Sequence, residues 1–305
     1  MDRLDRLGWA AGISVMAHGV RLGVRVTDPA AMGSVTSALP PGWRQARGSK
    51  VDHLFSLVVG GSVSPRGSVR RLHLLYRDAE RVARDREWEP VLEALETELR
   101  RTVAELAPRR VFVHAGVVRW RGRAILVPGR TFTGKTTLVS ELVRAGAAYY
   151  SDEYAALDEH GRVHPFPKPL SVREGAHRGR DVAPESLGGT SGRRAIPVGA
   201  VVMTEYRSGA TWRPRQRSEG EGALALLGNA VSARRRPDRV MTAVRSAMPG
   251  VLVLAGTRGE ADGTAREILR RADGWFGQEG PGPLQTAASG VDASMSALAP
   301  WEVRP

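Results

Sequence analysis

Apolar and polar residues alternate in the first quarter of the chain, and this pattern predicts β-strands. The alternation from Val20 to Val26 follows the dipeptide His18-Gly19, so residues 13–26 are predicted to form a β-hairpin. Three more elements are expected on the same criteria: a short helix over residues 28–39, ended by two prolines, and strands over residues 52–60 and 70–77. We therefore expect a small α+β unit here.

Helical spacing of apolar residues is clearest between Glu87 and Ala107. The apolar residues of one predicted face recur every three or four positions: Trp88, Val91, Leu92, Leu95, Leu99, Val103 and Leu106. Pro90 lies in the first turn and Pro108 follows the end, which are positions that helices tolerate. We expect this helix to pack against the rest of the fold without chemistry of its own.

The pattern changes after residue 110. Apolar strands are predicted over residues 111–120 and 124–127, joined by the turn Arg121-Gly122. The second strand leads into a glycine-containing segment, and a helix is predicted over residues 136–144. The elements expected beyond it are strands over 147–157, 162–164, 200–206 and 251–255, helices over 222–233 and 264–272, and a long loop over 165–195.

These elements predict an α/β fold, α+β overall. We expect an N-terminal α+β unit of residues 1–105 and a nucleotide-binding unit of residues 106–276. Residues 277–305 are rich in Gly, Pro, Ser and Ala and are predicted to be a disordered tail.

Composition narrows the class of protein. The 305 residues are 42% hydrophobic and 25% charged, as in ordinary soluble globular chains. The chain has no cysteine, which excludes disulfides, thiolate zinc sites and cysteine nucleophiles. It contains no apolar run long enough to cross a membrane, and its first residues lack the apolar core of a secretory signal. We expect a cytoplasmic protein with no membrane partner.

The net charge of +13 comes almost entirely from arginine, since the only lysines are Lys50, Lys135 and Lys168. A compositional bias toward arginine explains most of the excess, and a polyanionic partner is the alternative. Nucleic acid ranks last among the partners, because the sequence has no recognition motif that combines aromatic and basic residues. Lys135 is notable because it stands where a phosphate-binding loop requires a lysine.

The segment from Gly129 to Thr136 matches the P-loop pattern, with two glycines, a lysine and a hydroxyl residue at the required spacing. In such a loop the backbone N–H groups and the N-terminus of the following helix bind phosphates. Lys135 would reach the β- and γ-phosphates, and the Thr136 hydroxyl would ligate Mg²⁺. The predicted nucleotide-binding residues are Gly129, Arg130, Thr131, Phe132, Thr133, Gly134, Lys135, Thr136 and Thr137.

An acidic pair, Asp152-Glu153, follows 17 residues after Lys135, at the end of an apolar stretch. A strand that returns beside the P-loop strand would bring both carboxylates to the phosphates. One carboxylate can hold Mg²⁺, and the other can accept the proton of an attacking hydroxyl. The alternative is a solvated Asp-Glu pair at a strand end, but the short spacing from the P-loop favours function.

Taken together, these motifs resemble the HPr kinase/phosphorylase catalytic domain, which shares its P-loop fold with phosphoenolpyruvate carboxykinase. The resemblance covers residues 108–175 and rests on the segment from His114 to Val118, the P-loop and the acidic pair, with His114 placed 21 residues before Lys135. Two departures are Phe132 within the P-loop and Glu153, where the family has a second aspartate. The N-terminal unit also differs from the usual regulatory domain of that family.

The resemblance implies a kinase that uses ATP and Mg²⁺ to phosphorylate a serine of a protein or peptide. Asp152 would hold the metal together with Thr136, Glu153 would act as the base, and His114 would lie near the γ-phosphate. Arg173 resembles the arginine of a downstream signature loop. The departures point away from HPr as substrate and toward HPr-kinase-related enzymes of peptide-modifying systems, such as kinases of lasso peptides.

Several alternatives stay open at this point. The chain could be a non-catalytic ATP-binding scaffold, or a kinase of small molecules. A histidine on an apolar strand such as His114 is more often a core residue than a catalytic one. The arginine clusters 193–194 and 234–236 are more often solvated surface than substrate sites. No zinc site is predicted, and assembly into a homo-oligomer is left undecided.

Overall fold

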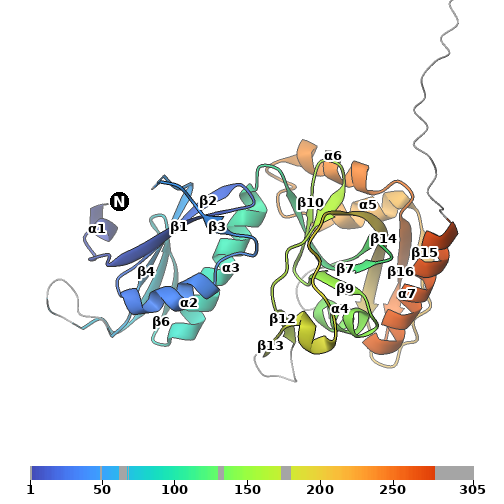
Figure 1. The fold of residues 1–305 in the computed structure, drawn as a ribbon, viewed down its shortest axis with the longest axis horizontal. Coiled ribbons are helices and arrows are strands. Elements are labelled where there is room, and N and C mark those ends of the chain that lie inside the picture. The colour runs from blue at the N-terminus through green and yellow to red at the C-terminus, as the bar shows by residue number, and fades with distance from the viewer. Residues whose placement is uncertain are drawn as a thin grey trace, which may run out of the picture.

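The computed structural model describes residues 2–48, 50–61, 67, 69–129, 134–172 and 180–278. It is a mixed α/β protein built around two large β-sheets, with the N-terminal sheet on one side of the long helix α3 and the second sheet on the other (Figure 1). The predicted α+β character of the chain is therefore present. None of the helices in these ranges is long and apolar enough to cross a lipid bilayer.

The first sheet has the strand order β3-β1-β2-β4-β5-β6. Its strands are β1 (Ala11–Ala17), β2 (Val20–Val26), β3 (Arg44–Gln45), β4 (His53–Val58), β5 (His73–Arg77) and β6 (Glu80–Asp85). The predicted hairpin is confirmed, and its turn places His18 and Gly19 at positive φ. The predicted strands at 52–60 and 70–77 are also confirmed. Strand β6 was missed, because its sequence is mostly polar and lies half-exposed at the sheet edge.

The predicted helix at 28–39 is a short 3₁₀ turn, Pro29–Ala31, followed by helix α2 (Met32–Ser37). The long amphipathic helix is confirmed as α3 (Trp88–Leu106). Its residues Val91, Leu95 and Leu99 are fully buried in one apolar cluster with the strands of the first sheet. Three aromatic residues from beyond α3 join the same cluster: Phe112, Tyr154 and Phe166. The apolar core under the first sheet therefore continues into the second half of the chain.

The second sheet has the strand order β11-β10-β7-β8-β14-β16-β15, with β9 paired to β7. Its strands are β7 (Val111–Trp120), β8 (Arg123–Pro128), β9 (Ala148–Ser151), β10 (Tyr154–Leu157), β11 (Arg162–His164), β14 (Ile196–Tyr206), β15 (Arg215–Arg217) and β16 (Leu252–Arg258). Strands β8, β14 and β16 run parallel in its centre. Parallel strands are normally covered on both faces, and this arrangement requires helices on both sides.

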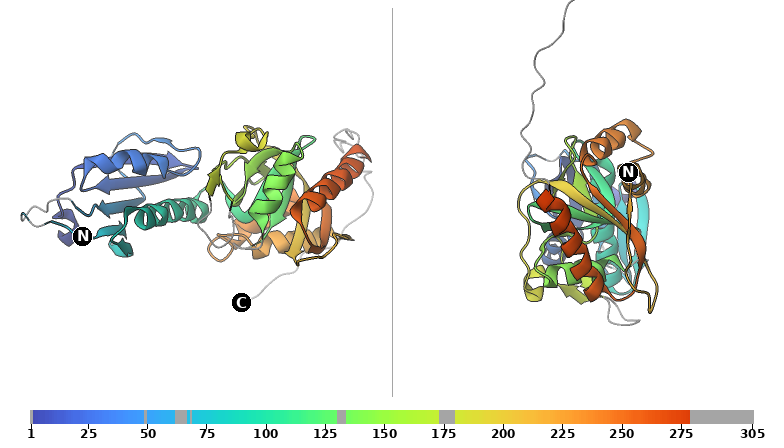
Figure 2. Two further views of the ribbon diagram at one scale, coloured as in Figure 1. Left: turned by 90° about the horizontal axis from the view of Figure 1, so that it is seen from below. Right: turned by 90° about the vertical axis from the view of Figure 1, so that its right-hand side faces the viewer.

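The two faces of β8 pack against different helices. Ala124 and Leu126 face one apolar cluster, which includes residues of α5 (Glu219–Gly228) and α6 (Pro237–Ala247). Ile125 and Val127 face the other, which includes residues of α4 (Lys135–Arg144) and α7 (Ala261–Gln278). Figure 2 shows α4 and α7 side by side on one face of the sheet. The second half of the chain is thus a three-layer α/β/α arrangement.

Several predicted elements have different bounds in the structure. The predicted strand at 147–157 is two strands, β9 and β10, and the break between them holds Asp152 and Glu153. The predicted loop at 165–195 contains a small two-stranded sheet, β12 (Leu170–Val172) with β13 (Arg180–Val182), and a 3₁₀ turn, Pro184–Leu187. These strands were missed because they are three residues long and lie among glycines and prolines.

The predicted helix at 222–233 is shifted toward the N-terminus. Ser218 and Glu221 form a capping box, so α5 begins at Glu219 and ends at Gly228. Helix α6 was not predicted, although Pro237 stands at its first turn. Helix α7 is longer than the predicted 264–272 and runs to Gln278, so the first two residues of the predicted tail are helical. Residues 279–305 of that tail lie outside the described residues.

Candidate functional site

The glycine-containing segment connects the end of β8 at Pro128 to the start of α4 at Lys135. The predicted strand before this segment and the predicted helix after it are therefore present. Four of the predicted nucleotide-binding residues lie outside the described residues: Arg130, Thr131, Phe132 and Thr133. Gly134 caps α4 with a left-handed φ of 75°, and a Cβ at this position would lie 2.5 Å from Nη2 of Arg258. Only glycine satisfies both conditions.

Asp152 lies beside the N-terminus of α4. Its Oδ2 accepts a hydrogen bond from the Thr136 hydroxyl at 3.3 Å, and its Oδ1 accepts one from the Tyr149 hydroxyl at 3.2 Å. The residue is only 6% exposed. Burial raises the pKa of Asp152 above its ordinary value, and the negative charge of Glu153 adds to this effect, whereas Lys168 opposes it. Asp152 and Thr136, the two residues predicted from the sequence to hold the metal, are therefore in contact.

The turn that carries the acidic pair is held by Ser151. Its hydroxyl accepts hydrogen bonds from the backbone N–H groups of Glu153 and Tyr154, at 3.1 and 3.0 Å. The carbonyl of Glu153 accepts a hydrogen bond from the N–H of Ala115 on β7. These bonds anchor both carboxylates to strand β7, next to the P-loop strand.

Glu153 is paired with two cations. Its Oε2 lies 2.9 Å from Nε of Arg100 and 3.9 Å from Nζ of Lys168. The Arg100 N–H does not point at the carboxylate oxygen, so the contact is an ion pair without hydrogen-bond geometry. Burial by itself would lower the pKa of Arg100, but the charges of Glu153 and Glu96 raise it. The candidate base is therefore held by an arginine from α3.

His114 lies on β7 opposite Tyr154, and the two rings are 4.9 Å apart between centroids. Its carbonyl accepts a hydrogen bond from the N–H of Gly129, at the start of the glycine-containing segment. Burial lowers the pKa of His114, Glu153 opposes this effect and Lys135 adds to it. A neutral imidazole is therefore favoured at neutral pH.

Lys135 occupies the first position of α4. Burial lowers its pKa, and the charges of Asp152 and Glu153 act in the opposite direction. The contact of Thr136 with Asp152 and the pairing of His114 with Tyr154 bring residues from three separate segments of the sequence together. Arg173, the fifth predicted catalytic residue, lies outside the described residues.

Sequence reasoning missed four residues of this region: Arg100, Tyr149, Lys168 and Arg258. The Tyr149 hydroxyl shares its one proton between the Asp152 carboxylate at 3.2 Å and the carbonyl of Lys168 at 2.8 Å. Helix α3 was expected to carry no chemistry, yet Arg100 is 8% exposed and faces Glu153. An arginine within the buried face of α3 was the available signal. Lys168, one of only three lysines, was a weaker one.

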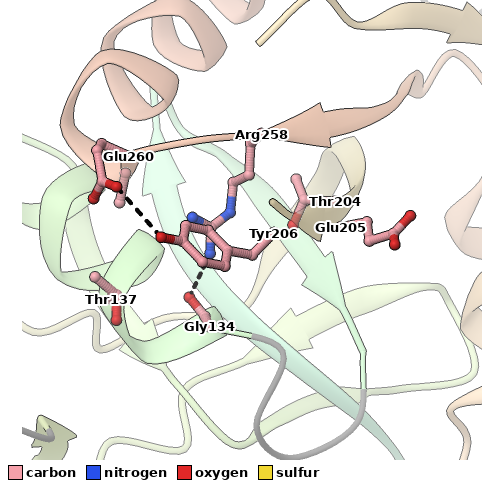
Figure 3. Close-up of a pocket in the computed structure, with 8 residues that line it drawn as sticks. Gly134, Thr137, Thr204, Glu205, Tyr206, Arg258 and Glu260 are labelled. Atoms are coloured by element: carbon pink, nitrogen blue, oxygen red, sulfur yellow. Dashed lines mark hydrogen bonds between the residues drawn. The ribbon is translucent and has the colours of Figure 1, made fainter. Parts of the chain in front are cut away.

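A cavity of about 500 Å³ opens on the opposite side of α4, at the carboxyl ends of the parallel strands β14 and β16. We call it the β14–β16 cavity. It is lined by Gly134, Thr137, Thr204, Glu205, Tyr206, Arg258, Glu260 and Ala261. Figure 3 shows the Tyr206 ring lying across the Arg258 guanidinium, with Gly134, which caps α4, and Thr137 of α4 beside it. Carboxyl ends of parallel strands are a usual place for ligands in α/β sheets.

The residues around Asp152 fit a magnesium ion. Mg²⁺ prefers oxygen ligands and is commonly held by one or two protein groups together with substrate phosphates. The Asp152 carboxylate and the Thr136 hydroxyl supply such oxygens within 3.3 Å of each other. The described residues contain no cluster of three or more His, Cys, Asp or Glu side chains that could hold a metal by themselves.

The chain was compared with protein-family models and with curated protein sequences. No protein-family model matches the chain, and no curated protein sequence matches it significantly.

Proposed function

We propose that this protein is a kinase that uses ATP and Mg²⁺ to phosphorylate a serine hydroxyl of a protein or peptide. The observation that carries the proposal is the contact between Thr136, directly after the P-loop lysine, and Asp152 of the acidic pair. A phosphate-binding cation, a hydroxyl and two carboxylates then face one site. The resemblance to HPr kinase/phosphorylase, and hence a P-loop fold of that type, is part of the same proposal.

In the proposed reaction the acceptor hydroxyl oxygen attacks the γ-phosphorus of ATP. The bond between that phosphorus and the β–γ bridging oxygen breaks, and ADP leaves with the electron pair. The hydroxyl proton passes to Glu153. Lys135 neutralises the charge on the transferring phosphoryl group, and the N-terminus of α4 provides backbone N–H groups for the phosphates.

Asp152 and Thr136 would hold Mg²⁺, which when bound neutralises charge on the β- and γ-phosphates. Burial of Asp152 raises its pKa, and hydrogen bonds from Tyr149 and Thr136 together with Lys168 favour its ionised form. A neutral His114, with its lowered pKa, can accept a hydrogen bond near the phosphates without adding charge.

The acceptor class rests on the family resemblance and on the departures from it, which favour a peptide over HPr. The test is incubation of the full chain with ATP, Mg²⁺ and candidate peptides, including those encoded beside its gene, followed by mass spectrometry. We expect a mass increase of one phosphoryl group on a serine, absent with Lys135→Ala. Tight ATP binding without transfer to any peptide or small hydroxyl compound would contradict the proposal.

One observation favours a second function, a non-catalytic ATP-binding scaffold. Glu153 is already paired with Arg100 and Lys168, so its carboxylate is engaged in contacts within the protein. In this alternative, ATP binding would be transmitted to α3 through the same ion pair. The two functions differ in whether ATP is converted to ADP when an acceptor is present.

A further inference from the structure

The β14–β16 cavity lies on the far side of α4 from the acidic pair. In the sheet, β8 has β7 on one side, with the acidic pair beyond it, and β14 followed by β16 on the other. Thr136 reaches Asp152, whereas Thr137, one residue on and about 100° further around the helix, lines the cavity. A nucleotide that had its γ-phosphate at Asp152 and extended past the N-terminus of α4 would bring its other end to this cavity.

Arg258 is an arginine at this cavity that is only 2% exposed. Its Nη1 and Nη2 donate hydrogen bonds to the carbonyls of Gly259 and Gly134, at 3.0 and 2.9 Å. Its Nε is buried without a hydrogen-bond partner, and no carboxylate of the described residues lies within ion-pair distance of it. Buried charges are normally paired. The Glu260 carboxylate lines the same cavity and acts on Arg258 from beyond ion-pair distance, so the guanidinium charge has no close ion pair.

Tyr206 stands over Arg258, with the guanidinium carbon 5.4 Å from the ring centroid. Its hydroxyl donates a hydrogen bond to Oε1 of Glu260 at 3.3 Å, which fixes the direction of the ring. The ring is nevertheless 49% exposed, which makes it one of the few exposed large apolar side chains among the described residues. An exposed aromatic ring held in place at a cavity is suited to stack on a planar base.

We propose that the β14–β16 cavity binds the α-phosphate and the ribonucleoside of the nucleotide. Arg258 provides the positive charge that faces the α-phosphate, and Tyr206 provides the platform for the base. The Glu260 carboxylate accepts hydrogen bonds from ribose hydroxyls. This inference rests on the proposed nucleotide-binding function and adds a specific location for the nucleoside.

The experiment compares two ligands that differ only in the nucleoside. Isothermal titration calorimetry of the full chain in the presence of Mg²⁺ measures the Kd for ATP and for inorganic tripolyphosphate. The variants are Tyr206→Ala, Tyr206→Phe and Lys135→Ala. Leu224→Ala, which changes another exposed side chain on α5 away from the cavity, is the control. Circular dichroism melts confirm that each variant is folded.

We expect Tyr206→Ala to weaken ATP binding about 10-fold, as for loss of a base-stacking ring, and to leave tripolyphosphate binding within about twofold. Tyr206→Phe keeps the ring but loses the hydroxyl that bonds Glu260, so its Kd for ATP should lie between those of the wild type and Tyr206→Ala. Lys135→Ala should weaken both ligands, and Leu224→Ala should change neither.

Unchanged ATP binding by Tyr206→Ala would overturn the assignment of the nucleoside to the β14–β16 cavity. An equal loss of affinity for both ligands would also overturn it, because the variant would then disturb phosphate binding. Equal affinity of the wild type for ATP and tripolyphosphate would also overturn it, while leaving the phosphate site intact. If the wild type bound neither ligand, the proposed function itself would fail, and the nucleoside site with it.

Discussion

The two sides of the N-terminus of α4 differ in how their charged side chains are paired. On the β7 side, the carboxylates of Asp152 and Glu153 lie within 4.0 Å of Lys168, and Glu153 also contacts Arg100. On the β14 and β16 side, Arg258 is buried with no ion pair among the described residues. The first side has close ion pairs within the protein. On the second side the Glu205 and Glu260 carboxylates line the cavity, but neither forms an ion pair with Arg258.

This difference in ion pairing matches the two proposed roles, which are phosphoryl transfer on the β7 side and nucleoside binding on the β14 and β16 side. A side that is neutralised internally can keep two carboxylates close to an anionic triphosphate without strong repulsion. A side whose buried cation has no close ion pair can gain when an anion arrives. We therefore expect changes on the β7 side to affect transfer and stability, and changes on the other side to affect nucleotide affinity.

The largest effect is expected from Lys135→Ala, because Lys135 is the lysine of the P-loop pattern and stands at the start of α4. Removal of a phosphate-clamping cation should reduce transfer by on the order of 10³-fold or more and abolish measurable ATP binding. Titration calorimetry and a phosphoryl-transfer assay check both effects. Lys50→Ala, which removes an exposed lysine of the first half of the chain, is the control and should behave like the wild type.

Glu153→Gln tests the β7 side alone. Loss of a general base should slow transfer by about 10²–10⁴-fold, and ATP should still bind, because the P-loop residues are unchanged. Single-turnover kinetics at saturating ATP measures this effect. A Gln variant with full activity would eliminate Glu153 as the base, and no detectable transfer by the wild type would favour the scaffold.

Arg100→Met tests whether α3 positions the base. The substitution keeps an apolar side chain in the buried face and removes the charge opposite Glu153. Breaking a buried ion pair costs about 3–5 kcal/mol, and we expect about 2 kcal/mol in urea unfolding, since Lys168 remains beside Glu153. Arg100→Lys should recover part of the loss. In a double-mutant cycle with Glu153→Gln, a coupling energy near zero would mean that the pair carries no interaction.

The smallest effect on stability is expected from Asp152→Asn, which should raise Tm slightly. The same substitution should impair phosphoryl transfer. Burial raises the pKa of Asp152 above its ordinary 3.8, so ionisation costs stability in the folded protein. The cost is absent below 3.8, where the carboxyl is protonated in both states, and is complete above the folded-state pKa. Asn at this position should therefore raise Tm by about 2 °C at pH 8, and the gain should shrink as the pH falls.

Asp158→Asn is the control of opposite sign for that experiment. Burial of Asp158 acts to raise its pKa, but hydrogen bonds from His164 and from backbone N–H groups lower it overall. Its ionised form stabilises the fold above 3.8, and this contribution disappears as the pH falls through the lowered pKa. Asn at position 158 should therefore lower Tm at pH 8. An increase in both variants would mean that burial is not the cause at Asp152.

Elements with a strong local pattern were predicted well from the sequence. The first hairpin, α3 and β8 each have a run of apolar residues with a clear period, and their bounds agree within a few residues. Strand β6 was missed because most of its residues are polar. Helix α6 was missed although its buried residues Val240, Ala243, Val244 and Ala247 recur at helical spacing. The split of the predicted strand at 147–157 was missed because Ser151 turns the backbone through hydrogen bonds of its hydroxyl, which apolar periodicity does not report.

The sequence by itself determined the chemical inventory of the candidate site: the lysine and hydroxyl after the glycine segment, and the acidic pair 17 residues later. Their spacing is local, and local spacing can be read along the chain. Only the tertiary structure decided which distant residues complete that inventory. Arg100 precedes Glu153 by 53 positions, and Arg258 follows Gly134 by 124. Such pairs meet because strands and helices bring them together, and no pattern along the chain encodes that contact.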